Sequence, residues 1–111
     1  MKHITYADKS VLVGDHTADL LLEYAAALGV ANSADTVSIH AISSDGDDVE
    51  AMFLLGQGAP LMSETAHSSL PDPQNVDADT YLRDHLDRLQ RPLNAQALAA
   101  GAEWVEDLSG F

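Results

Sequence analysis

Apolar residues change their spacing along the chain, and this change constrains the fold more than any other feature of the sequence. Ala18, Leu21, Leu22, Ala25 and Leu28 recur every three or four residues, which is the spacing of one face of an α-helix. From residue 36 to residue 55, apolar and polar residues alternate, as they do in a strand with one buried face. Helical spacing returns after residue 77. The fold therefore contains both helices and strands.

Two β-hairpins are predicted. The first brings residues 4–6 and 11–13 together around a polar turn at the start of the chain. The second joins strands at 36–43 and 49–55 through Asp45-Gly46, a dipeptide that favours tight turns. We expect this second hairpin to form the centre of an antiparallel sheet.

The two faces of the strand at 36–43 differ in polarity. Val37, Ile39 and Ala41 fall on one face, and His40 falls on the other with a threonine and a serine. The first face is expected to join the hydrophobic core. Residues 61–66 are a candidate for one further strand.

Three helices are predicted from their apolar stripes and end signals. Asp15 or Thr17 is expected to cap the first helix, and Gly29 to end it. The second is expected to begin at an Asp77 cap and to end at Pro92. A third, rich in alanine, is expected to run from Asn94 to about residue 107.

The predicted fold class is α+β, with element order ββαβββαα. It consists of a small antiparallel sheet, made of the two hairpins and the candidate fifth strand, with helices packed on one face. The length of 111 residues and the 46% hydrophobic content predict a single domain over residues 1–111. Its C-terminal helical segment is expected at about 77–108.

Fixed charge is distributed unevenly. The formal net charge is −13, and no Lys or Arg occurs between Ser10 and Leu82. Such a surface repels phosphate backbones and anionic lipid headgroups, so direct binding to nucleic acid or membrane is not expected. A protein partner with a basic surface would be attracted instead. The same charge also agrees with a purely solubilising role or with adaptation to a salty cytoplasm.

No residues are predicted to be catalytic, metal-binding or cofactor-binding. The chain has no cysteine, which excludes disulfides, thiolate metal sites and cysteine nucleophiles. Its five histidines lack the spacing of metal ligands, and the acidic turn at 45–48 lacks the EF-hand pattern. Serines flank His67 without a nucleophile elbow, and Gly56-Gln57-Gly58 is not a dinucleotide-binding fingerprint. Without a signal sequence or a membrane-spanning stretch, the expected location is the cytoplasm.

The leading functional hypothesis is a small acidic, non-catalytic protein that binds a basic partner or associates with itself as a homodimer. The interaction surface is predicted at Asp45, Asp47, Asp48, Glu50, Trp104 and Phe111. The two aromatic residues are typical anchors in interfaces. Trp104 equally fits a place in the domain's own core.

Two alternatives remain open. One is a small-ligand-binding protein or enzyme that uses the loop at 56–75, in which Glu64, His67 and Asp72 are the polar groups of interest. A pocket enclosing at least two of them would favour this class. The other is association that depends on pH through the histidines.

Overall fold

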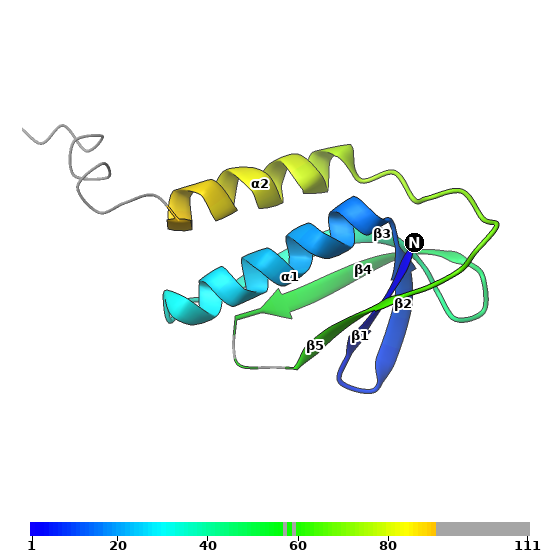
Figure 1. The fold of residues 1–111 in the computed structure, drawn as a ribbon, viewed down its shortest axis with the longest axis horizontal. Helices are drawn as coiled ribbons and strands as arrows, with labels where there is room; N and C mark the ends of the chain where they lie inside the picture. The colour runs from blue at the N-terminus through cyan, green and yellow to red at the C-terminus, as the bar shows by residue number, and fades with distance from the viewer. Residues whose placement is uncertain (57, 59, 91–111) are drawn as a thin grey trace, which may run out of the picture.

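A computed structural model describes residues 1–56, 58 and 60–90 of the chain (Figure 1). Five strands form one antiparallel sheet, and two helices lie side by side over it. The elements are β1 (Lys2–Tyr6), β2 (Lys9–Val13), α1 (Asp15–Val30), β3 (Asp35–Ile42), β4 (Asp48–Leu55), β5 (Leu61–Thr65) and α2 (Val76–Gln90). The α+β class, both hairpins and the fifth strand are confirmed. The predicted third helix lies outside the described residues, as do Trp104 and Phe111.

The position of the second hairpin in the sheet was predicted wrongly. The strand order is β4-β3-β2-β1-β5, so β4 is an edge strand and the first hairpin occupies the centre. β5 pairs with β1 along its full length, which places β1 inside the sheet. Alternating polarity identifies which strands have a buried face, but it does not show which neighbour each strand pairs with.

The sheet consists of two parts joined at one point. β3 and β4 are paired along their full length, whereas β2 and β3 share only the pair Leu12 and Ile42. Beyond this pair the first hairpin projects away from the helices in Figure 1. Most of the β2-facing edge of β3 is therefore left without a neighbouring strand among the described residues.

The hydrophobic core lies between the sheet and the helices. Val37, Ile39 and Ala41 are buried, which confirms the predicted inner face of β3. From α1, the buried side chains are Thr17, Ala18, Leu20, Leu21, Tyr24 and Leu28, so the buried face is centred slightly to one side of the predicted stripe. Leu82 and Leu86 of α2 complete the core.

Neither predicted cap at the start of α1 is used. The helix begins at Asp15, and Gly14 precedes it without a capping side-chain hydrogen bond. The hydroxyl of Thr17 donates instead to Asp79 Oδ1 at 2.6 Å. This bond ties the first turn of α1 to the first turn of α2.

At its other end, α1 continues one residue past the predicted stop at Gly29. Asn32 adopts a left-handed conformation with φ 55°, and its N–H donates to Gly29 O at 3.2 Å. The N–H of Ser33 donates to Leu28 O at 2.9 Å. These two bonds form a Schellman motif, in which asparagine takes the place more often held by glycine.

Asn75 joins α2 to the sheet. Its carbonyl accepts the N–H of Asp79 at 2.8 Å, so it occupies the position before the helix that Asp77 was predicted to fill. Its side chain turns toward β3 instead, where Oδ1 accepts the N–H of His40 at 2.7 Å and Nδ2 donates to His40 O at 2.8 Å. One amide side chain thus provides both hydrogen bonds that a neighbouring strand would provide there.

Gly56 shapes the end of β4. Its φ is +97°, and a Cβ added there would lie 2.3 Å from the carbonyl oxygen of Ser33. The backbone after β4 therefore packs directly on the connection between α1 and β3. Neither α1 nor α2 has the length and hydrophobicity of a membrane-spanning helix.

Candidate functional site: an acidic groove beside the β3–β4 hairpin

The β3–β4 turn places several carboxylates together at the surface. Ser43 N–H donates to Asp47 O at 2.8 Å, and Gly46 N–H donates to Ser43 O at 2.9 Å. Gly46 has φ +89°, which glycine adopts without steric cost. The predicted turn at Asp45-Gly46 is confirmed. Asp45, Asp47 and the adjoining Asp48 are all exposed.

Behind the turn, the outer face of the hairpin carries an imidazole beside a carboxylate. His40 of β3 lies directly opposite Glu50 of β4, and both side chains are exposed. The hydroxyl of Ser38 donates to Glu50 Oε2 at 2.6 Å, which fixes that carboxylate over the hairpin. Alternation along the two strands keeps these groups on the face opposite to the core.

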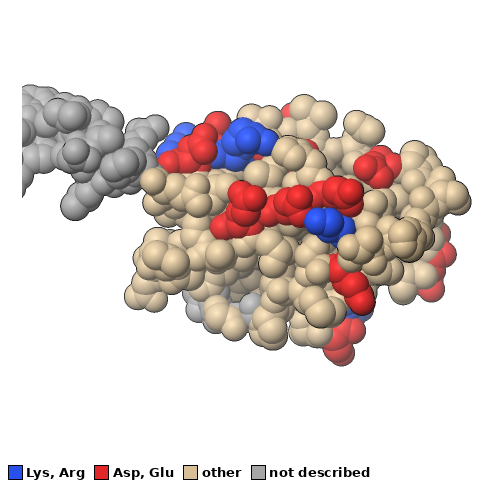
Figure 2. Space-filling view, in the orientation of Figure 1, with Lys and Arg blue, Asp and Glu red and all other residues tan. Residues whose placement is uncertain are grey.

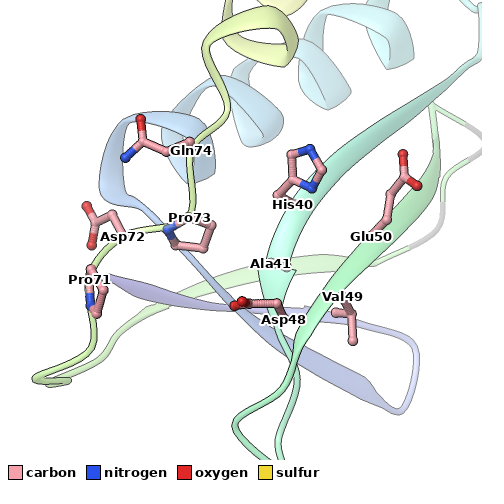
Figure 3. Close-up of a pocket in the computed structure, with 9 residues that line it drawn as sticks. All are labelled: His40, Ala41, Asp48, Val49, Glu50, Pro71, Asp72, Pro73 and Gln74. Carbon is pink, nitrogen blue, oxygen red and sulfur yellow. The ribbon is translucent and has the colours of Figure 1, made fainter.

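Two adjoining depressions, of about 520 and 390 Å³, lie between this face, the loop before α2 and the first turn of α2. They share His40, Glu50 and Gln74, and we refer to them together as the acidic groove. Its lining comprises Ser38, His40, Ala41, Asp48, Val49, Glu50, Pro71, Asp72, Pro73, Gln74, Asn75, Val76, Asp77 and Ala78. Figure 3 shows His40 and Glu50 extending to the same side of the hairpin, with Asp72 and Gln74 on the loop beside them.

The asparagine that binds β3 positions one wall of the groove. Because Asn75 is bonded to both backbone groups of His40, the loop that ends at Asn75 is held beside the open edge of β3. The same residue precedes α2, so the first turn of the helix, with Asp77, is placed at the groove as well.

The charge of the groove is negative. Four carboxylates line it, from Asp48, Glu50, Asp72 and Asp77, and none of the described Lys or Arg residues does. The cations lie elsewhere: Lys2 forms an ion pair with Asp19 at 2.6 Å, and Arg83 contacts His16 at 3.0 Å.

A second acidic surface follows α1. Figure 2 shows a row of acidic side chains across the face of the molecule that carries this helix, with a basic side chain against it. Asp15, Asp19 and Glu23 are spaced by four residues and so share one side of the helix. The ion pair from Lys2 partly neutralises this row, whereas the acidic groove has no cation among its lining residues.

The polar groups that line the groove are mainly carboxylate oxygens. No group of three or more His, Asp or Glu side chains in the described part of the chain is placed to hold a metal ion. The Ser38 hydroxyl is bonded to Glu50. What the groove offers is a set of oxygen acceptors suited to an ammonium or guanidinium group.

The predicted interaction residues are only partly brought together. Asp48 and Glu50 line the groove, while Asp45 and Asp47 lie in the turn beyond it. Of the alternative set at 56–75, Asp72 lines the groove, and Glu64 lies on β5 opposite His3 and is not among the groove residues. His40, Gln74 and Asp77 were missed. Of these three, only His40 could have been found from the sequence, because it was predicted to lie on the outer, polar face of its strand.

A separate polar cluster joins both helices to the start of β3. Tyr24 of α1 and Tyr81 of α2 each donate their hydroxyl to Asp35 Oδ2 at 2.6 Å, and the ring of Tyr81 stacks on His85 with 3.8 Å between ring centres. Burial and the bond to Asp35 raise the pKa of Tyr24, and the bond to Asp35 raises that of Tyr81. Partial burial acts to raise the pKa of Asp35, but hydrogen bonds from the two tyrosines and from the backbone of Thr36 hold it below its ordinary value.

No protein-family model, curated protein or solved structure matches the chain. The acidic groove is the feature that combines a surface depression with a consistent chemical character, since carboxylates from the hairpin, the loop and α2 all line it.

Proposed function

We propose that this protein is a non-catalytic interaction module that binds cationic side chains of a partner protein in the acidic groove. One observation carries the proposal: the groove is lined by Asp48, Glu50, Asp72 and Asp77 and by none of the described Lys or Arg residues. A lysine or arginine from a partner would supply the missing positive charge.

The physical basis is charge-assisted hydrogen bonding in a partly enclosed site. Hydrogen bonds between a cation and a carboxylate are shorter and stronger than neutral ones, and arginine binds carboxylates through two parallel bonds. Glu50 is held in place by Ser38, which lowers the entropy lost when a partner binds. The net charge of −13 adds long-range attraction for basic proteins and repulsion of polyanions.

The proposal can be tested with a hexa-arginine peptide as the probe. Backbone amide NMR spectra of the full chain, recorded as the peptide is added, should change at Asp48, Glu50, Gln74 and Asp77. Glu23 on α1 should change little. Binding should weaken as salt is raised, because exposed charges are screened.

A triple variant of groove carboxylates gives a sharper test. Asp48→Asn, Glu50→Gln and Asp72→Asn together should weaken peptide binding roughly tenfold, since each exposed ion pair contributes modestly. The matched control removes the same charge from exposed helical positions through Glu23→Gln, Asp84→Asn and Asp87→Asn. An equal loss of affinity in the two variants would show that only net charge matters and would overturn the proposal.

Self-association is a second candidate, favoured by exposed apolar side chains on the outer face of β4. Met52 is 73% exposed and Leu54 is 47% exposed. Large apolar groups at the surface are frequent in protein interfaces. Sedimentation velocity over a range of concentrations would detect a homodimer, and a constant monomer mass would eliminate this candidate.

A further inference from the structure

The free edge of β4 carries backbone groups that no described strand satisfies. β4 pairs only with β3 in the described part of the sheet. Both backbone groups of His40 bond to Asn75, so the pair of His40 with Glu50 shares no hydrogen bonds across the two strands, and the backbone groups of Glu50 face away from β3. The hydroxyl of Tyr6 donates to Leu54 O at 2.6 Å. In an antiparallel pair the direction of the backbone groups alternates, so Met52 and Glu50 present their N–H and C=O groups to the same free side.

This edge carries two carboxylates, from Asp48 and Glu50, but lacks three other common protections against strand addition. Natural edge strands are commonly protected by lysine, proline or a bulge. The sequence of β4, DVEAMFLL, contains neither lysine nor proline, and its pairing with β3 is continuous from Asp48 to Leu55. The Tyr6 hydroxyl occupies only the C-terminal end of the edge, at Leu54.

An apolar pocket lies next to the same edge. It has a volume of about 360 Å³ and is formed by the first hairpin on one side and by β4 on the other. We refer to it as the edge pocket, and its lining includes Tyr6, Asp8 and Lys9 of the first hairpin and Ala51, Met52 and Phe53 of β4. The rings of Tyr6 and Phe53 meet edge to face, with 5.9 Å between their centres. The apolar lining suits an apolar side chain, and its two charged residues, Asp8 and Lys9, are of opposite sign.

Position along β4 links the edge pocket to the acidic groove. Ala51 lines the pocket, whereas Glu50 and Asp48 line the groove and lie on the outer face. Residues directly opposite each other in an antiparallel pair share a face. A strand added beside β4 would therefore direct a residue opposite Ala51 toward the pocket, and residues opposite Glu50 and Asp48 toward the carboxylates.

We propose that the partner binds as an extended peptide segment that adds antiparallel to β4, with an apolar residue in the edge pocket and Lys or Arg one and three residues later. This inference rests on the proposed function, because the two cations are those that the acidic groove recognises. Backbone hydrogen bonds to Glu50 and Met52 supply affinity, and the alternating side chains supply selectivity, as in other cases of strand addition.

Charge complementarity favours a basic segment over a second copy of this chain. β4 contains no cation, so pairing with another β4 would leave Asp48 and Glu50 of both copies without a positive partner. In a segment with the pattern apolar, basic, any, basic, the apolar residue fills the edge pocket and the two cations pair with Glu50 and Asp48. Its backbone bonds to the free edge of β4.

The test uses the full chain and the synthetic peptide Thr-Val-Thr-Phe-Arg-Thr-Arg-Thr, with affinity measured by fluorescence anisotropy. N-methylation of the first arginine blocks the N–H that would bond to Glu50, and it should weaken binding roughly tenfold. N-methylation of the phenylalanine is the matched control, because that N–H would point away from β4; it should have little effect. Replacing the phenylalanine with alanine should also weaken binding roughly tenfold.

The outcomes separate this inference from the proposed function. Equal binding by the two N-methylated peptides, or no binding by the parent peptide at millimolar concentration, would overturn strand addition. Weaker peptide binding by the variant Asp48→Asn/Glu50→Gln would support recognition by the acidic groove, whether or not the peptide adds as a strand. Unchanged binding by this variant would overturn the proposed function itself. A homodimer that Met52→Lys disrupts would show that a second copy occupies the edge and would also overturn the inference.

Discussion

The side chain of Asn75 bonds to both the N–H and the C=O of His40, so it takes the place of a neighbouring strand at this one position on the open edge of β3. Asn75 is only 6% exposed, and water has little access to these bonds. Because the same residue precedes α2, the pairing connects the sheet, the loop and the helix that together form the acidic groove.

Replacing this amide should destabilise the fold. Asn75→Ala leaves the N–H and C=O of His40 without these partners, and the expected loss is about 1–3 kcal/mol in the free energy of unfolding. Asn75→Asp should be at least as damaging, because a carboxylate would face the carbonyl of His40. Urea unfolding measures both, with the exposed neighbour variant Gln74→Ala as the control. A loss for Asn75→Ala no larger than that of the control would contradict the structural role.

Replacing two glycines with alanine should change the stability of the protein in opposite directions. Gly56→Ala should cost more than roughly 2 kcal/mol, because it places a methyl group against the Ser33 carbonyl at a left-handed φ. Gly29 lies in the last turn of α1 with nothing within 4 Å of an added Cβ. Gly29→Ala should therefore stabilise the helix by about 0.5–1 kcal/mol. Thermal melts followed by circular dichroism compare the two; a rise in Tm for Gly56→Ala would refute the packing described here.

A glycine in the turn of the first hairpin should make the folded protein more stable. Ala7 has φ 57° and is the first of the two residues that join Tyr6 to Lys9. Left-handed backbone costs an alanine about 1–2 kcal/mol, so Ala7→Gly should raise the stability by about 1 kcal/mol. Ala26→Gly, at an exposed position in α1, is the contrasting variant and should lower it by a similar amount. Chemical unfolding at one pH measures whether each variant gains or loses free energy of unfolding. A loss of stability in both variants would count against strain at Ala7.

Acid should remove the contribution of the Asp35 cluster. The pKa of Asp35 is lower in the folded chain than its ordinary value. The carboxylate therefore contributes stability above the unfolded pKa of about 4, and this contribution is lost as the pH falls through the folded pKa. Asp35→Asn should lower stability at pH 7 and flatten its dependence on pH below about 5. Tyr81→Phe should flatten it partly, since one donor from Tyr24 remains. The free energy of unfolding is measured between pH 2 and 7 for each variant. A dependence on pH equal to that of the original protein would contradict this role of Asp35.

Local patterns were sufficient for most elements of the fold. The alternation of Val37, Ile39 and Ala41 predicted the inner face of β3, and Asp45-Gly46 predicted its turn, because both depend on neighbours in the sequence. The end of α1 was missed because asparagine, at position 32, took the left-handed place. The edge position of β4 was missed because strand order depends on pairings between distant segments, such as β1 with β5.

The positions of the residues that line the candidate groove could be foreseen only in part, for the same reason. Asp48 and Glu50 were identified from the acidic run itself. His40 and Asp77 became groove residues only through the path of the loop before α2, and that path is set by Asn75, whose role no local pattern indicates. A polar residue next to a helix is ordinarily expected to cap that helix, rather than to bond to a strand 35 residues earlier.

The single pair of Leu12 and Ile42 between β2 and β3 has a mechanical consequence. The two walls of the edge pocket belong to the two hairpins that meet at this pair, so any change in the angle between the hairpins would change the width of the pocket. The hydrogen bond from the Tyr6 hydroxyl to Leu54 O joins the two hairpins and would limit such a change. Incoming side chains of different bulk would be accommodated by a change in that angle, without repacking the core beneath the helices.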